Sequence, residues 1–195
     1  MIIMNKYYEK IEKVITSFRT KMDDFGMIIN PITLARQESV RIAQEKFTHP
    51  KLLGRLGYYR INIEEGKEPL HIICCSDTIT PHDKKYAFVL SHELGHCFMY
   101  KEGLFEYPEV STIFEGFDED YLSNEDGLDE IELACNMFAR EMLMPEIKFR
   151  MGVKHYVLLG RDIKREKNII ADRLSGDFNV PHIHVLKRGN ELGVW

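Results

Sequence analysis

Residues 92–96 read His92-Glu93-Leu94-Gly95-His96, an HExxH motif within a segment of helical character. Histidines four positions apart lie one turn apart on the same helix face, so their imidazoles can converge on one metal ion. Glu93 points about 100° round the helix from its neighbour. Its carboxylate would then stand beside the metal, where it can accept a proton from an attacking water. The motif is typical of the catalytic metal site of a zinc hydrolase.

The residues before the motif predict where its helix begins. Residues 70–75 form a short apolar run that suits a buried strand. After it, Thr80 can cap a helix, Pro81 fits the first helical position, and Asp83 stands three residues after the cap. Apolar residues then cover most of the circumference as far as Met99, as expected for a helix in the centre of a domain.

A third ligand is required, because catalytic zinc takes three protein ligands and a water. Residues 129–145 have helical periodicity, with acids at their start and a proline at their end. We choose Glu132 in this helix as the third ligand, and Asn136 shares its face. Glu130 and Glu141 remain alternatives. Glu132 could also be a solvated acid in the first turn that binds no metal and only interacts favourably with the helix dipole.

Together the two segments resemble the ImmA/IrrE family of HExxH metallopeptidases. In that family HELGH is followed by a helix of the form E-x-x-A-N-x-F-A-x-E-L-L-M-P, and residues 132–145 here read ELACNMFAREMLMP. Cys135 stands where alanine is usual and Met142 where leucine is usual. Both departures are mild, so the metal site that the family pattern describes is retained.

The resemblance implies a zinc ion bound by His92, His96 and Glu132, with Glu93 as general base, in a domain of roughly residues 30–150. Members of the family often act as regulatory proteases beside mobile elements or phage genes and cut a helix-turn-helix repressor. We therefore expect a zinc-dependent, site-specific intracellular protease whose substrate is a DNA-binding repressor. Two alternatives are a non-proteolytic metal-containing regulator that binds a protein partner and a toxin–antitoxin component.

The predicted fold class is α+β: a zincin-like metalloprotease domain, mostly helical, with a small antiparallel or mixed sheet packed on the HExxH helix. The expected elements, read from periodicity and turn signals, are helices at 7–22 and 32–47, a strand at 55–63, a turn at 65–67, a second strand at 70–75, and two short C-terminal helices that meet at 179–181.

We expect one compact unit with three parts. An N-terminal helix occupies residues 1–30, the zincin-like metallopeptidase domain residues 31–150, and a helical packing or partner-contact element residues 151–195. In zincin proteases the edge strand of the sheet pairs with an extended substrate. By resemblance, Gly57, Tyr58 and Tyr59 are the candidates for that edge, and the alternative is that they are ordinary strand residues.

Charge is unevenly distributed along a chain whose net charge is −5. Residues 102–130 contain eleven acids and no Lys, Arg or His, whereas the chain after Pro145 contains ten Lys or Arg and six acids. The acidic stretch is either a solvated connection between the two motif helices or part of a cleft that favours basic substrates. The chain lacks the broad basic face of a DNA-binding protein, so direct nucleic-acid binding is not expected.

Composition indicates a cytoplasmic protein. No apolar run reaches the length of a membrane helix, and Lys6, Glu9 and Lys10 interrupt any signal-peptide core at the start. The four cysteines show no CxxC spacing, which favours buried thiols, although Cys97 directly follows a ligand and could confer metal or redox sensitivity. We interpret four of the six histidines outside the motif as packing or surface residues: His71, His155, His182 and His184.

Overall fold

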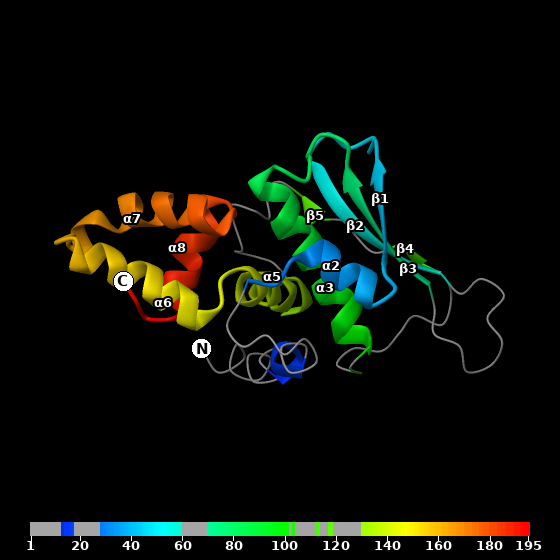
Figure 1. Ribbon diagram of the computed structural model, residues 1–195. Coiled ribbons are helices and arrows are strands. Elements are labelled where there is room, and N and C mark those ends of the chain that lie inside the picture. The colour runs from blue at the N-terminus through cyan, green and yellow to red at the C-terminus, as the bar shows by residue number, and fades with distance from the viewer. Residues whose placement is uncertain are drawn as a thin grey trace.

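The computed structural model describes residues 13–17, 28–59, 70–101, 103, 112–113, 117–118 and 130–195. Helices α3 (Lys84–Lys101) and α5 (Glu130–Leu143) cross at the centre. A sheet lies at the right of the view and three C-terminal helices lie at the left, with α3 and α5 between them (Figure 1). The predicted α+β fold, mostly helical with a small mixed sheet on the HExxH helix, is confirmed.

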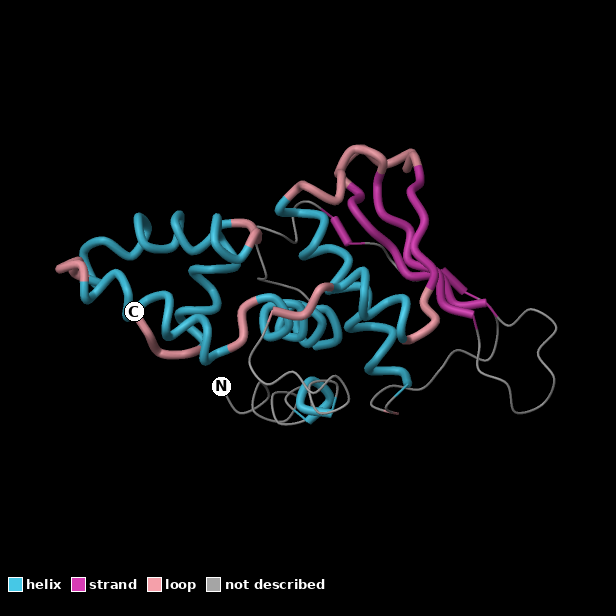
Figure 2. The backbone as a smooth tube through the Cα atoms, viewed as in Figure 1, coloured by secondary structure: helices cyan, strands magenta, loops and turns pink. Residues whose placement is uncertain are grey.

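The sheet combines parallel and antiparallel pairing. Its strands are β1 (Arg41–Glu45), β2 (Leu52–Tyr59), β3 (Leu70–Ser76), β4 (Thr112–Ile113) and β5 (Phe117–Asp118). The order is β1-β3-β2-β4, and β5 also pairs with β2. Only β1 and β3 run parallel among the described strands. Figure 2 shows the strands gathered on one side of α3.

The β2–β3 pair is antiparallel, as the sequence predicted. Side chains alternate along β3, so His71, Ile73 and Cys75 are buried whereas Leu70, Ile72 and Cys74 are half-buried. This period of two presents one face of the sheet to α3. The predicted turn at 65–67 and residues 60–63 of the first strand lie outside the described residues.

The prediction of one long helix at 32–47 is wrong. Helix α2 covers only Pro31–Gln37, capped by Asn30, whose Oδ1 accepts hydrogen bonds from the backbone N–H groups of residues 32 and 33. Ser39 then adopts a left-handed conformation, with φ of 59°, and ends the helix. The following residues form β1, because pairing with β3 satisfies their backbone groups in register.

Helix α3 begins later than predicted. Thr80 and Pro81 lie in a turn closed by a 2.8 Å hydrogen bond from Asp83 N–H to the Thr80 carbonyl. The side chain of Asp83 instead caps the helix, since its Oδ1 accepts from Lys85 N–H at 3.0 Å. The predicted central position is confirmed, because side chains are buried round most of the circumference of α3.

Helix α5 packs across α3 and ends as predicted just before Pro145. A Cβ added at Gly95 of α3 would lie 3.2 Å from Cys135 Cα and 3.3 Å from Cys135 Cβ. Real Cβ atoms rarely approach backbone so closely, so glycine at this position lets the two helix axes come together. Phe98 and Phe138 continue the contact, with ring centroids 5.5 Å apart.

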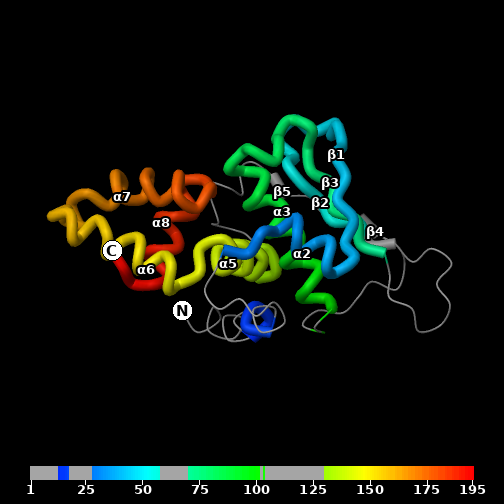
Figure 3. The backbone as a smooth tube through the Cα atoms, in the orientation of Figure 1, coloured from blue at the N-terminus to red at the C-terminus, as the bar shows by residue number. Residues whose placement is uncertain are grey.

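Three helices form the C-terminal part: α6 (Glu146–Leu158), α7 (Ile163–Phe178) and α8 (His182–Glu191). The last two meet at 179–181, as predicted, with Asn179 in a left-handed conformation. Helix α6 was not predicted. It follows α5 directly along the trace in Figure 3, and the predicted division at residue 150 falls inside it.

Two buried arginines join α8 to α5. Arg188 is hydrogen-bonded to the carboxylate of Glu141 and donates from Nε to the Met144 carbonyl at 3.1 Å. Arg140 pairs with Glu191 at 2.5 Å, and its side chain is only 2% exposed. Each guanidinium therefore meets a carboxylate from the other helix, which offsets the cost of removing both charges from water.

The N-terminal prediction is only partly visible in the structure. Residues 13–17 are helical, with Val14 and Ile15 buried, and the rest of the predicted helix at 7–22 lies outside the described residues. Within the part of the chain that the structure describes, no helix is both long enough and apolar enough to cross a membrane.

Candidate metal centre

The two motif histidines meet inside the molecule. His92 and His96 lie one turn apart on α3, and their exposed fractions are 0% and 4%. Their Nε2 atoms are 3.1 Å apart, and the rings stand nearly perpendicular with centroids 4.9 Å apart. Both imidazoles therefore present the same nitrogen to one point beside α3.

Glu132 reaches that point from α5. Its Oε2 lies 3.0 Å from His92 Nε2 and its Oε1 lies 3.2 Å from His96 Nε2. The alternative ligands lie elsewhere, since Glu130 is exposed at the start of α5 and Glu141 pairs with Arg188. Of the three acids considered as third ligand, the structure brings only Glu132 to the histidines.

The spacing of these atoms fits a tetrahedral zinc ion. Zinc binds imidazole nitrogen and carboxylate oxygen at about 2.0–2.2 Å, so two tetrahedral ligand atoms stand about 3.3 Å apart. The measured separations between the two Nε2 atoms and the carboxylate oxygens are 3.0–3.2 Å. The donor set of two imidazoles and a carboxylate is also one that catalytic zinc sites use.

The pKa values of Glu132, His92 and His96 show which of these groups carry charge in the folded protein. Burial opposes the ionised form of Glu132, but hydrogen bonds from His92 and His96 hold its pKa well below the usual value. Burial lowers the pKa of His92. Burial also acts to lower the pKa of His96, yet its neighbours Cys135 and Glu132 raise it well above the usual value. A carboxylate that stays ionised inside the protein suits a site for a cation.

Asn136 orients one of the histidines. Its Oδ1 lies 3.0 Å from His92 Nδ1, the ring nitrogen that faces away from the cluster. An acceptor there fixes the proton on Nδ1 and leaves Nε2 as a lone-pair donor to a metal. This role was not predicted, although the signal was present, because Asn136 stands four residues after Glu132 on the same face of α5.

Glu93 lies between α3 and the sheet. Its side chain is 1% exposed, and it packs against Gly54 of β2, where an added Cβ would lie 3.2 Å from Glu93 Oε1. A buried carboxylate next in sequence to His92 is placed to act as a general base beside a metal ion, if the two histidines hold one. The close approach of β2 is possible because residue 54 has no side chain.

Cys135 also belongs to the cluster. It lies on α5 three residues after Glu132 and is fully buried. Its Sγ and one ring nitrogen from each of His92 and His96 all lie within 4.8 Å of one another. Burial is the main cause that raises the pKa of the Cys135 thiol to about 11. The sequence interpretation treated it only as a buried thiol and missed this position.

Two of the three predicted substrate-binding residues, Gly57 and Tyr58, lie inside the sheet rather than at its edge. Gly57 pairs with Ile72 of β3 and with Ile113 of β4, and Tyr58 likewise has a partner on each side. The backbone groups of both residues are therefore used within the sheet. Tyr59 pairs with Leu70 of β3. On this side of β2 the sheet continues with β4 and β5, which come from the acidic stretch at 102–130.

The four histidines interpreted as packing or surface residues are not among the members of the cluster formed by His92, His96, Glu132 and Cys135. His71 and His184 are buried, and His184 stacks on Phe88 with ring centroids 3.4 Å apart. His182 lies 3.2 Å from the Asn168 carbonyl, and His155 is exposed. The interpretation of all four as packing or surface residues is consistent with these positions.

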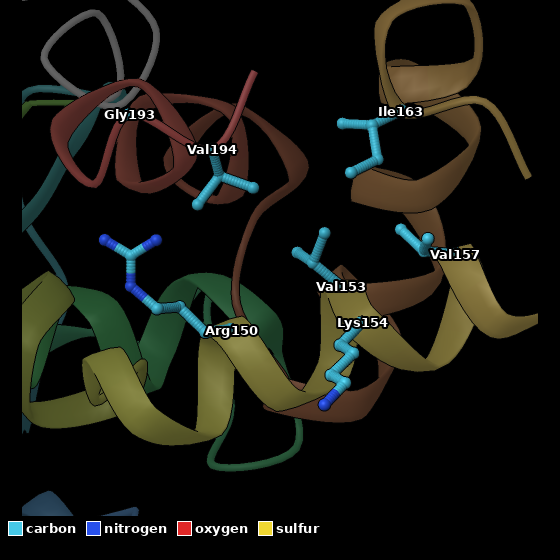
Figure 4. Close-up of a pocket in the computed structure, with 7 residues that line it drawn as sticks. All are labelled: Arg150, Val153, Lys154, Val157, Ile163, Gly193 and Val194. Carbon is cyan, nitrogen blue, oxygen red and sulfur yellow. The ribbon is translucent and has the colours of Figure 1, made fainter.

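A cavity of about 300 Å³ in the C-terminal part is not the predicted site (Figure 4). It lies between α6, the start of α7 and the end of the chain, and it contains no residue of the cluster. The lining residues are Arg150, Val153, Lys154, Val157, Ile163, Gly193 and Val194.

Comparison with known proteins agrees with the geometry of the cluster. Residues 69–188 match the family model described as the IrrE N-terminal-like domain, Peptidase_M78. The matched segment includes β3, α3 and α5 and so holds all the residues of the cluster. No curated protein matches the chain. Because the family match covers more than half of the 195 residues, this chain belongs to the Peptidase_M78 family of metallopeptidases with an IrrE N-terminal-like domain.

Proposed function

We propose that this metallopeptidase is a zinc-dependent protease that cuts a protein substrate at one defined site. The observation that carries the proposal is the convergence of three donors. The Nε2 atoms of His92 and His96 and the carboxylate of Glu132 lie 3.0–3.2 Å from one another. Glu93, buried beside them, supplies the base that peptide hydrolysis requires.

Each residue has a distinct part in this reaction. His92, His96 and Glu132 would hold the zinc ion, and Asn136 keeps the His92 ring in the orientation that binding needs. A bound zinc ion supplies a Lewis acid that acidifies water and polarises the scissile carbonyl. Glu93 accepts the proton of the attacking water and passes it to the leaving amine.

The proposed substrate is a helix-turn-helix repressor, and the reaction would relieve repression. Support comes from the resemblance to the ImmA/IrrE family and from charge. Residues 102–130, the stretch of sequence that contains β4 and β5, include eleven acids and no Lys, Arg or His. DNA-binding proteins carry basic surfaces, which such a stretch attracts.

The test is incubation of the zinc-loaded protein with the repressor encoded beside its gene, followed by mass spectrometry of the products. One discrete cut is expected, and it should be lost on chelation and in Glu93→Gln. The matched control is Glu130→Gln, an exposed acid on the same helix as Glu132. It should leave the cut unchanged.

Two other outcomes would reject this function. A stable complex with the repressor and no cut, for both the wild type and Glu93→Gln, would identify a binding regulator instead. A partner that is neutralised by complex formation and encoded in the same operon would identify a toxin–antitoxin component.

A further inference from the structure

Two crossing helices each contribute two metal-binding side chains to one buried cluster. Helix α3 contributes His92 and His96, four residues apart, and α5 contributes Glu132 and Cys135, three residues apart. Residues at both spacings share a helix face. The Cys135 sulfur is therefore on the same side of α5 as the Glu132 carboxylate, and it lies within 4.8 Å of ring nitrogens of both histidines.

The backbone holds Cys135 there. Gly95, between the two histidines, lies so close to Cys135 that an added Cβ would be 3.2 Å from Cys135 Cα. Cys135 is fully buried, so the thiol is enclosed among protein atoms beside the histidines rather than turned to solvent. The fully buried sulfur lies within 4.8 Å of a ring nitrogen of each histidine, so it is near any metal ion that the two imidazoles hold.

We propose that Cys135 Sγ is a fourth protein donor to the metal, beside His92, His96 and Glu132. This proposal rests on the proposed metal site and not on the identity of the substrate. The thiol releases its proton when it coordinates. Sulfur is a softer donor than carboxylate oxygen, so Cys135 shifts the preference of the site toward zinc and cadmium and away from manganese.

The fourth donor also has a consequence for catalysis. A zinc site with four protein ligands is closed, whereas a catalytic site keeps one position for water. As a fourth donor, Cys135 would therefore compete with water for a position on the metal.

The experiment is replacement of zinc by cobalt(II) in the full chain, with the absorption spectrum as readout. Sulfur coordination gives an intense near-ultraviolet charge-transfer band, whereas nitrogen and oxygen donors alone give only the weak visible bands. The wild type should show both kinds of band. Cys135→Ser and Cys135→Ala should lose the charge-transfer band and keep the visible bands. Cys97→Ala, a buried cysteine on α3 outside the cluster, should keep both.

Metal preference provides a second readout that does not depend on spectroscopy. Cys135→Ala should weaken cadmium binding by about tenfold or more, and manganese binding should change far less. The proposal is overturned if the wild type shows visible bands without the charge-transfer band, if Cys135→Ser retains that band, or if cobalt does not bind.

These outcomes are independent of proteolysis. A wild-type protein that shows the charge-transfer band and cuts no repressor would contradict the proposed substrate and support the fourth donor. A protein that cuts the repressor and lacks the charge-transfer band would support the proposed substrate and contradict the fourth donor.

Discussion

Gly54 of β2 lies directly against the Glu93 carboxylate of α3. A Cβ at residue 54 would stand 3.2 Å from Glu93 Oε1 and would collide with a methyl group of Val89, one turn earlier on the same helix. Packing of the sheet on α3 therefore sets the position of the proposed base. The sheet does more than cover the helix, because its backbone forms one wall of the site.

Gly54→Ala should reduce peptidase activity and leave zinc binding intact. The added methyl group must displace Val89 or Glu93, and a base displaced by about 1 Å can lower the rate about 100-fold. The check is cleavage rate and zinc content on the same sample. Gly176→Ala on α7 is the control, because an added Cβ there meets nothing within 4 Å. Loss of zinc in Gly54→Ala would show that the sheet positions the ligands rather than Glu93.

Glu93→Gln should lose catalysis without losing the metal. The amide cannot accept the proton of the attacking water, so the rate should fall by about 10²–10⁴. Because Glu93 is not one of the three converging donors, zinc measured by atomic emission should stay stoichiometric. An unchanged rate would exclude Glu93 as the general base.

Asn136→Ala should weaken zinc binding by about 10–100-fold, because the His92 ring loses the acceptor 3.0 Å from its Nδ1. Asn136→Asp restores an acceptor and should bind zinc more tightly than Asn136→Ala. Competition with a chromophoric chelator measures both affinities. Asn168→Ala, at an exposed position on α7, is the control. Equal affinities of Asn136→Ala and the wild type would remove Asn136 from the site.

Arg140→Met should destabilise the protein by about 1.5–3 kcal/mol, since the Glu191 carboxylate, only 11% exposed, would lose its 2.5 Å contact with Arg140 and keep the 3.4 Å contact with Arg188. Denaturant unfolding measures the change in the free energy of unfolding. Arg161→Met is the comparison, because the Arg161–Glu166 pair is largely exposed and should contribute at most about 1 kcal/mol. The double variant Arg140→Met/Glu191→Met should recover part of the loss, and a purely additive result would argue against the pairing.

His71 should make the stability depend on pH. Burial, together with nearby Lys101, lowers its pKa from 6.5 to about 4 in the folded protein. As pH falls from 6.5 toward 4, the unfolded chain binds a proton at His71 that the folded chain does not, so stability decreases over that window. His71→Gln should therefore show a smaller loss of stability between pH 7 and pH 4.5 than the wild type. The control variant His155→Gln, at an exposed position, should lose as much stability between pH 7 and pH 4.5 as the wild type does.

The elements that the sequence predicts well are those specified locally. The spacing of His92 and His96, and the apolar positions around them, indicate both the helix and the face it directs at a metal. Glu132 was chosen over Glu130 and Glu141 from its place in the helix, the family pattern supported that choice, and the structure places its carboxylate beside the histidines.

The elements that were missed depend on partners far along the chain. Residues 41–45 form a strand because they pair with β3, some thirty residues later, and this pairing outweighs the local preference for helix. The pairing of strand β2 on both sides was missed for a similar reason. Nothing near Gly57 shows that residues 112–113 occupy its outer side.

The contact between Gly95 and Cys135 restricts the choice of amino acid at position 95 more than at position 135. The atoms that crowd residue 95 include the Cα and Cβ of residue 135, which every amino acid but glycine possesses. Exchange of cysteine for alanine or serine at 135 therefore creates no room for a side chain at 95. Position 135 can therefore take changes that alter the chemistry of the site, whereas the short distance between the two helices favours glycine at position 95.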